Sequence, residues 1–313
     1  MADVKKIATR DSYGKALVEL GREHENVVVL DADLANATKT GVFQKEFPDR
    51  HFDCGIAEAN MMCVAAGLST TGLVPFASSF AMFASGRAFE QVRNSIGYPH
   101  LNVKIGATHG GISVGEDGAS HQCCEDFALM RSIPGMVVIC PADDVEARAA
   151  VKAAYEYEGP VYLRFGRLAV PVFHEEEGYS FQIGKGEVLR DGADVAILAT
   201  GLMVYEALQA AEALEAEGIR PMVVNLPTVK PLDEELVLAA AAKCGKVITC
   251  EEHSVIGGLG EAVCSLLSER LPTPVRRIGV NDEFGHSGPA VPLLKQFGLS
   301  AEHITEVARD FCK

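Results

Sequence analysis

The segment Gly106-Ala-Thr-His-Gly-Gly-Ile-Ser-Val-Gly-Glu-Asp-Gly-Ala-Ser-His-Gln122 is the part of the sequence that says most about the fold. It follows a run over residues 101–105, Leu-Asn-Val-Lys-Ile, whose alternation of apolar and polar residues is typical of a β-strand. Its five glycines let the backbone pass close to a ligand or adopt a positive φ. Loops of this kind carry function when a rigid scaffold positions them. From these residues alone the segment is either a binding loop or a solvated glycine-rich connection.

Outward from this segment, short apolar runs alternate with segments of helical length. In the first half the runs are 27–30, 74–76, 103–105, 137–139 and 161–163, and the helical segments are 11–24, 57–70, 80–97, 123–132 and 143–155. Further runs follow at 195–198, 222–224 and 247–249, with helical segments near 203–217, 233–242 and 259–270. This alternation predicts parallel sheets flanked by helices. We therefore expect an α/β protein of two Rossmann-like three-layer domains, 1–170 and 191–313, joined by a linker over 171–190.

The bulk composition restricts the function. A length of 313 residues fits about two domains. The net charge of −15 argues against nucleic-acid and anionic-membrane partners, so an anionic substrate would need a local basic pocket. The first residues lack the apolar core of a signal peptide, and no run approaches the roughly 20 apolar residues that span a bilayer. Nine cysteines without a C-x-x-C pair favour reduced thiols, so we expect a cytoplasmic protein.

Two motifs lie upstream of the glycine-rich segment. In Phe52-Asp-Cys-Gly-Ile-Ala-Glu-Ala-Asn-Met61, the single acid Glu58 begins an otherwise apolar helical segment. It is either a first-turn acid that favours the helix dipole, or a partly buried acid that exchanges a proton with a ligand. In Pro75-Phe-Ala-Ser-Ser-Phe-Ala-Met-Phe83, Phe80 and Phe83 would share one face of a helix, either as core or as an aromatic pocket.

In order and spacing, these three motifs resemble the pyrimidine-binding domain of transketolases, a thiamin-diphosphate family, and residues 193–313 resemble the transketolase C-terminal domain. The resemblance implies that Glu58 hydrogen-bonds to the aminopyrimidine of thiamin diphosphate and that Phe80 and Phe83 enclose the ring. The sequence departs from the family at Gly86, where many transketolases continue the aromatic set.

The resemblance also assigns residues to the substrate. His109 and His121 would contact groups near C1 of a ketose and manage hydroxyl protons, which suits a side chain that titrates near neutrality. Asp117 would bind a hydroxyl further along the sugar. Arg10 and Arg167 would bind a sugar phosphate, for which a planar guanidinium is well shaped.

The phosphate assignment leaves alternatives open. Arg164 competes with Arg167 for the same position in the alignment, and Ala37 replaces a serine of the family. Both Arg10 and Arg167 also suit a helix-start or surface ion-pair role.

The chain lacks the Gly-Asp-Gly segment with which thiamin-diphosphate enzymes hold the diphosphate and Mg²⁺. We therefore expect the C-terminal subunit of a split transketolase, a transferase of two-carbon ketol units between sugars or sugar phosphates. An N-terminal transketolase subunit would hold the diphosphate and Mg²⁺ in an α2β2 heterotetramer, and this chain would supply no metal ligand and be active only with that partner.

Two other functions fit the same pattern of domains. One is the β subunit of a 2-oxo acid dehydrogenase, and the other is a non-catalytic assembly or regulatory subunit. His109 together with Gly115-Glu-Asp-Gly118 favours transketolase over the dehydrogenase. The intact motif around Glu58 argues against a non-catalytic subunit.

Overall fold

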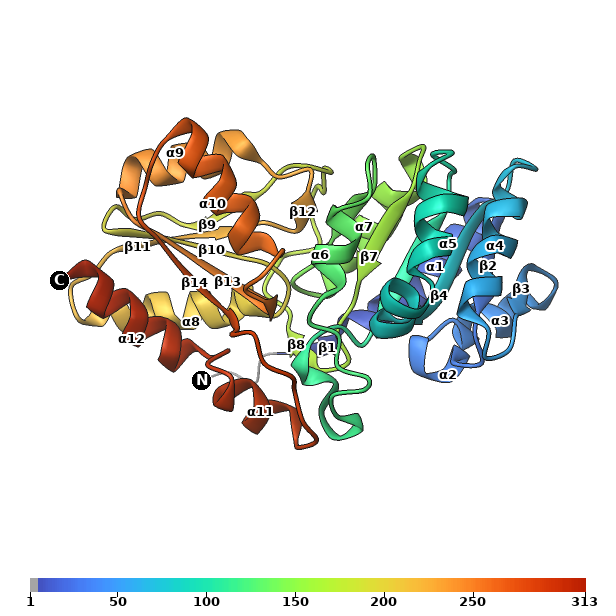
Figure 1. Ribbon diagram of the computed structural model, residues 1–313, viewed down its shortest axis with the longest axis horizontal. Helices are drawn as coiled ribbons and strands as arrows, with labels where there is room; N and C mark the ends of the chain where they lie inside the picture. The colour runs from blue at the N-terminus through green and yellow to red at the C-terminus, as the bar shows by residue number, and fades with distance from the viewer. Residues whose placement is uncertain (1–4) are drawn as a thin grey trace.

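The computed structural model describes residues 5–313, so the first four residues of the predicted first domain lie outside it. The chain forms two α/β units side by side, the first from its N-terminal half and the second from its C-terminal half (Figure 1). Within the described residues, no helix has the length and apolar character needed to cross a membrane.

The first unit is built on a seven-stranded sheet in the order β12-β6-β7-β5-β4-β2-β3. Its parallel strands are β2 (Val27–Asp31), β3 (His51–Asp53), β4 (Val74–Phe80), β5 (Lys104–Thr108), β6 (Val137–Ile139) and β7 (Val161–Arg164). Strands β2, β4 and β5 are buried along their whole length. That burial is expected because helices cover both faces of a parallel sheet. Strand β2 is almost entirely apolar, whereas β4 also buries Ser78 and Ser79 and β5 buries Lys104.

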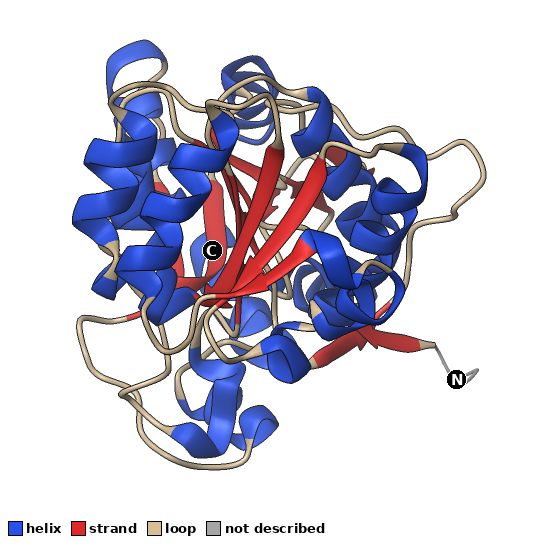
Figure 2. Ribbon diagram, turned by 90° about the vertical axis from the view of Figure 1, so that its right-hand side faces the viewer, coloured by secondary structure: helices blue, strands red, loops and turns tan. Residues whose placement is uncertain are grey.

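Helices lie on both sides of this sheet (Figure 2). Alternate residues of its strands pack against the two different helical layers. In β2, Val27 and Val29 pack towards α1 and α7, whereas Val28 and Leu30 pack towards α4. The helices of this unit are α1 (Thr9–Glu23), α2 (Ala35–Thr38), α3 (Gly41–Glu46), α4 (Glu58–Ser69), α5 (Phe89–Gln91), α6 (Asp126–Arg131) and α7 (Asp144–Glu156). The predicted three-layer arrangement is therefore confirmed.

The predicted helix over 80–97 is wrong in its details. Strand β4 continues to Phe80, and two π-helical turns, η2 (Met82–Arg87) and η3 (Val92–Gly97), flank the short α5. Phe80 therefore ends a strand and does not share a helical face with Phe83. Strand β4 is buried to its last residue although Ser78 and Ser79 interrupt its apolar sequence, so its extent depends on the elements packed against it and not on local spacing.

The second unit has a five-stranded sheet in the order β14-β13-β10-β11-β9. Strands β10 (Val195–Ala199), β11 (Pro221–Asn225), β13 (Val247–Ser254) and β14 (Val275–Val280) are parallel, and β9 (Glu187–Arg190) is antiparallel to β11. Its helices are α8 (Met203–Ala216), α9 (Glu234–Cys244), α10 (Leu259–Arg270), α11 (Ala290–Gln296) and α12 (Ala301–Cys312). Helices α8, α11 and α12 cover one face, and α9 and α10 cover the other.

The two units are more closely joined than a simple linker would require. The short strand β12 (Thr228–Lys230) leaves the second unit and pairs with β6 at the edge of the first sheet. Near the start of the chain, β1 (Lys6–Ala8) pairs with β8 (Ala169–Pro171). One buried apolar cluster runs from α4 in the first unit to α9 and α10 in the second. The sequence did not indicate β1, β8 or β12, because each is only three residues long and, unlike β6, is not a run of large apolar residues.

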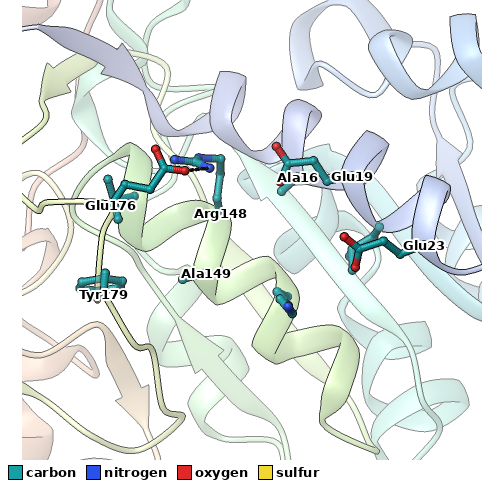
Figure 3. A pocket seen from close by; sticks show the side chains of 10 residues that line it. Ala16, Glu19, Glu23, Arg148, Ala149, Glu176 and Tyr179 are labelled. Atoms are coloured by element: carbon teal, nitrogen blue, oxygen red, sulfur yellow. Dashed lines mark hydrogen bonds and ion pairs between the residues drawn. The ribbon is translucent and has the colours of Figure 1, made fainter.

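The segment between β8 and β9 lies against the outer helices of the first unit. It borders a surface cleft of about 220 Å³ between α1 and α7, where Arg148 pairs with Glu176 at 2.8 Å (Figure 3). Charged side chains of both signs line this cleft, and none of the predicted site residues lies in it.

Candidate active site

The predicted site residues gather where the strands of the first sheet end. Parallel strands place their carboxyl ends at one edge, and open α/β sheets bind ligands there. Phe80 ends β4, His109 directly follows β5, and Arg164 ends β7. Glu58 begins α4 after β3, and Arg10 lies in the first turn of α1. The sheet topology therefore brings together residues that are distant in the sequence.

Four aromatic rings form one cluster at this edge, which we call the ring cluster: Phe80, Phe83, His109 and His121. Phe80 stacks on His109 with ring centroids 3.8 Å apart, and on Phe83 with centroids 5.9 Å apart. His121 meets both phenylalanines edge-on, at 5.3 Å from Phe83 and 6.2 Å from Phe80. The residues expected at the cofactor and at the sugar therefore share a single continuous surface.

His109 is held as a neutral imidazole. Its Nε2 lies 3.0 Å from an Arg10 amino group, and its Nδ1 lies 2.8 Å from the hydroxyl of Thr108. A guanidinium only donates, so Nε2 accepts and Nδ1 carries the proton. Burial, aided by the positive charges of Arg10 and Arg167, lowers the pKa of His109 to about 3. The expectation that His109 titrates near neutrality is therefore wrong for this arrangement.

A local group of cations surrounds His109 in this otherwise acidic protein. Arg10, Lys39 and Arg167 all lie close enough to lower the pKa of His109. Burial, and the neighbouring charge of Arg167, also lower the pKa of Arg10, against the opposing effect of Asp11. Arg10 donates to the backbone oxygen of Ala37 at 3.1 Å.

The two competing arginines occupy different environments. Arg164 is buried, with its Nε 2.9 Å from a carboxylate oxygen of Asp126. Arg167 is more than a third exposed and donates to Glu116 at 2.9 Å, beside the glycine-rich loop. Arg164 is therefore committed to the interior, whereas Arg167 is accessible to a ligand.

Glu58 is buried at the start of α4, with 2% of its surface exposed. Both of its carboxylate oxygens accept from one amino group of Arg87, at 3.0 Å each. The guanidinium carbon of Arg87 also lies 4.4 Å from the centroid of the Phe83 ring. Arg87 thus connects Glu58 to the ring cluster. Arg87 was not identified from the sequence, although it directly follows Gly86, where the sequence departs from the family.

Asp117 does not join the ring cluster. It is exposed at the end of η4 (Ile112–Asp117), the turn that carries the middle of the glycine-rich loop. Of the predicted site residues, the structure therefore brings together Arg10, Glu58, Phe80, Phe83, His109, His121 and Arg167, and leaves Asp117 at the rim.

Comparison with known proteins agrees with this arrangement. Residues 5–172 match the family model "Transketolase, pyrimidine binding domain", and residues 184–304 match "Transketolase, C-terminal domain". The chain is 46% identical over 302 residues to a 6-deoxy-6-sulfo-D-fructose transketolase subunit of Clostridium sp., covering 96% of this chain and 93% of that protein. It is 39% identical over 307 residues to one subunit of the apulose-4-phosphate transketolase of Phocaeicola vulgatus, covering 98% of both.

A solved structure described as "Split gene transketolase, inactive beta4 tetramer" superimposes with a TM-score of 0.91. Its sequence is 56% identical, and the match covers 97% of this chain and 98% of that one.

The fold and the ring cluster define a protein of the thiamin-diphosphate class that carries the pyrimidine-binding unit. The chain belongs to the transketolase family, as the sequence motifs indicated, and corresponds to the C-terminal subunit of a split transketolase. Its reaction is the thiamin-diphosphate-dependent transfer of ketol groups that defines this family. The family assignment decides against the dehydrogenase alternative.

Proposed function

We propose that this chain works in the cytoplasm as one half of an α2β2 transketolase that moves a two-carbon ketol unit between sugars carrying a terminal anionic group. Its N-terminal partner subunit would bind the diphosphate and Mg²⁺. The observation that carries the proposal is the ring cluster, which lies between the buried Glu58 and a group of cations.

The ring cluster and Glu58 fit the aminopyrimidine of the cofactor. Phe83 is half-buried, so one aromatic side chain remains accessible beside the buried Phe80. Phe80 and Phe83 would enclose the pyrimidine, and the Glu58 carboxylate would hold a proton at one of its ring nitrogens. The cofactor, when bound, supplies the carbanion-stabilising centre for the two-carbon unit.

The cations and histidines fit the substrate. Arg10 and Arg167 would bind the terminal anion, since charge-assisted hydrogen bonds to a guanidinium suit phosphate and similar groups. His121 would take part in proton transfer at a substrate hydroxyl, and Asp117 would bind a hydroxyl near the rim. For His109, held neutral, a substrate hydroxyl would take the place of the Arg10 amino group at Nε2 while Arg10 binds the anion. The names of two relatives specify anionic sugars, one a sulfonate and one a phosphate, which supports an anion pocket here.

This chain also exposes an apolar surface that the proposed partner subunit would cover. Helix α4 is apolar nearly all round, and such helices are normally buried on every side. Yet Cys63 and Val64 on α4 are exposed, and the preceding Ile56 is 76% exposed. We propose that subunit contacts cover this face beside Glu58. The relative described as an inactive β4 tetramer supports the view that β chains alone assemble without activity.

The proposal is tested by co-purifying the chain with its native partner from the source organism. The isolated chain should bind thiamin diphosphate weakly in calorimetry and transfer no ketol unit. The reconstituted complex should bind the cofactor in a Mg²⁺-dependent manner and be active. Micromolar Mg²⁺-dependent affinity, or turnover, in the isolated chain would contradict the division of labour between subunits.

A further inference from the structure

Two adjacent buried carboxylates near the end of β13 point to different parts of the molecule. Glu251 accepts hydrogen bonds from the backbone nitrogens of Leu259 and Gly260, at 2.7 and 2.8 Å, and so caps α10 within its own unit. Glu252 faces the other way, as successive residues of a strand do. One of its oxygens accepts from the backbone nitrogen of Ser113 at 2.6 Å, inside the glycine-rich loop of the first unit.

The start of this loop rests directly on Glu252 and Arg164. A Cβ added to Gly110 would overlap the Arg164 side chain, and one added to Gly111 would overlap the Glu252 carboxylate. Arg164 also donates to the backbone oxygens of Glu252, at 2.8 Å, and Cys123, at 3.3 Å. The two glycines are therefore required because two buried side chains press against the backbone at this point.

The residue before these glycines is His109, whose backbone φ is +60°. Residues with a Cβ rarely adopt this left-handed conformation, and it persists only where the surroundings hold it. On one side, Thr108 and Arg10 bind the imidazole. On the other side, Gly110 and Gly111 are held against Arg164 and Glu252. The orientation of His109 in the ring cluster therefore depends on a side chain from the second unit.

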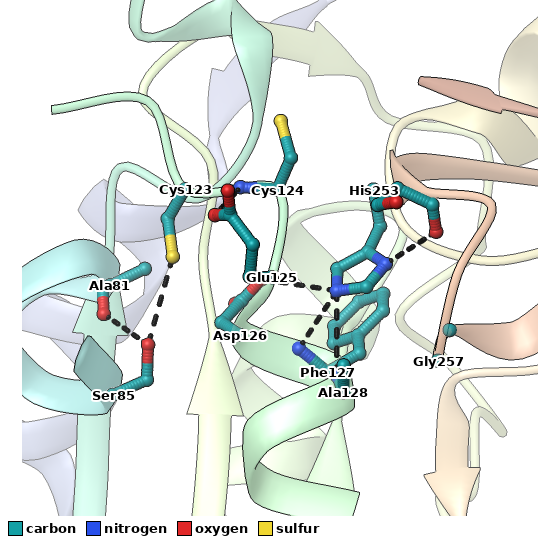
Figure 4. Close-up of polar contacts among 12 residues, drawn as sticks. Ala81, Ser85, Cys123, Cys124, Glu125, Asp126, Phe127, Ala128, His253 and Gly257 are labelled. Carbon is teal, nitrogen blue, oxygen red and sulfur yellow. Dashed lines mark hydrogen bonds and ion pairs between the residues drawn. The ribbon is translucent and has the colours of Figure 1, made fainter. Parts of the chain in front are cut away.

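The next residue of β13 supports the far end of the same segment. His253 is buried, and its Nε2 accepts from the backbone nitrogens of Phe127 and Ala128, at 3.1 and 3.4 Å, at the start of α6 (Figure 4). Its Nδ1 donates to the backbone oxygen of Ser254 at 2.7 Å. Glu252 and His253 thus contact both ends of the stretch from Gly111 to Ala128, which includes the glycine-rich segment from Gly111 to Gln122.

From this geometry we propose that Glu252 is a positioning residue for ketol transfer: it reaches from the second unit to fix the backbone at Gly111 and Ser113, and so sets His109 in the ring cluster. The role of His109 at the substrate rests on the proposed function above. The fixing of the loop does not, because it depends only on contacts within this chain.

The test uses the reconstituted two-subunit complex and separates the length of the side chain from its charge. Glu252→Gln keeps an acceptor oxygen at the right reach for Ser113, whereas Glu252→Asp keeps the charge but is one methylene shorter. Glu251→Asp is the matched control. The Glu251 carboxylate is next to Glu252 in the sequence and equally buried, but it caps α10 and does not hold the loop.

Hydrogen exchange of peptides from 106–122 and the kinetics of ketol transfer are the two readouts. Glu252→Asp should raise exchange in this loop and lower kcat by about tenfold or more, with little change in the KM for thiamin diphosphate. Glu252→Gln should retain most of both properties. Glu251→Asp should raise exchange in α10 and leave the loop unchanged.

Equal loop exchange in the parent and Glu252→Asp complexes would overturn the proposal, and so would the same kcat loss in Glu251→Asp. If the parent complex transferred no ketol unit at all, the proposed function would fail, while the exchange readout would still decide whether Glu252 fixes the loop.

Discussion

The two α/β units have similar sheets but use the ends of their strands differently. In the first unit, β4 and β5 lead into Phe80 and His109, beside a half-buried ring and accessible cations. In the second, β13 carries Glu251, Glu252 and His253, all buried. In the first unit the strand ends carry the residues of the proposed site, whereas in the second they carry side chains that contact the first unit. We therefore propose that a similar topology serves as a site in one unit and as a support in the other.

The largest expected effect is at the edge of the first sheet that carries Glu58 and the ring cluster. Glu58→Gln in the reconstituted complex should lower ketol transfer by about 10²–10⁴-fold, because an amide keeps the shape but cannot exchange the proton. The measurement is the rate at which the C2 proton of bound thiamin diphosphate exchanges with solvent, alongside a circular-dichroism check of the fold. An unchanged exchange rate would mean that Glu58 serves only the start of α4.

His109→Ala and His121→Ala test whether the two histidines of the ring cluster act on the substrate and not on the activation of the cofactor. Each should lower ketol transfer by about 10²-fold, a typical size for one positioned proton-transfer or hydrogen-bonding group. C2 proton exchange should stay near the parent rate, since Glu58 and the phenylalanines remain. His109→Ala should affect cofactor affinity more than His121→Ala, because only His109 stacks closely on Phe80. If both variants keep full transfer, the glycine-rich loop is merely a connection.

Substitutions of Arg167 and Arg164 should distinguish a residue that binds substrate from one that supports the fold. Arg167→Ala should raise the KM for a phosphorylated sugar by about 10–100-fold, the loss of one or two charge-assisted hydrogen bonds. The KM for the unphosphorylated sugar should hardly change. Arg164→Ala should instead lower the denaturant midpoint, because it leaves Asp126 buried without its partner. The reverse outcome would assign the anion to Arg164.

The smallest expected effect concerns the supporting carboxylates. Burial raises the pKa of Glu252 to about 7, with Asp126 adding to the shift and Arg164 opposing it. The folded chain thus keeps a proton that the unfolded chain releases, so stability falls as pH rises from about 4.5 to 7 and then levels off. Between pH 5 and 7, the free energy of unfolding should fall by roughly 1–2 kcal/mol more in the parent than in Glu252→Gln.

Chemical denaturation at the two pH values measures this difference. Glu251 has its pKa raised to about 7 by burial as well, so Glu251→Gln is expected to remove a similar part of the pH dependence. Identical slopes in the parent and both variants would show that these acids are ionised in the fold at pH 5.

The sequence by itself determined the elements and the family. Apolar runs and helical segments predicted most of the parallel strands and most of the helices, because the period of a strand or helix is a local property, but they did not predict the parallel strands β3 and β14. The motifs around Glu58, Phe80 and His109 predicted that these residues lie together at one edge of the first sheet, since residues that directly follow parallel strands converge there. The roles assigned to these side chains stay predictions.

Only the tertiary structure decided which of these residues touch. The extension of β4 to Phe80, the stacking of Phe80 on His109 and the low pKa of His109 all depend on how separate elements pack. The same holds for the contact between Glu252 and Ser113, which are 139 residues apart. Local patterns carry no record of such contacts, because burial and charge at a strand end are set by whichever distant segment packs against it.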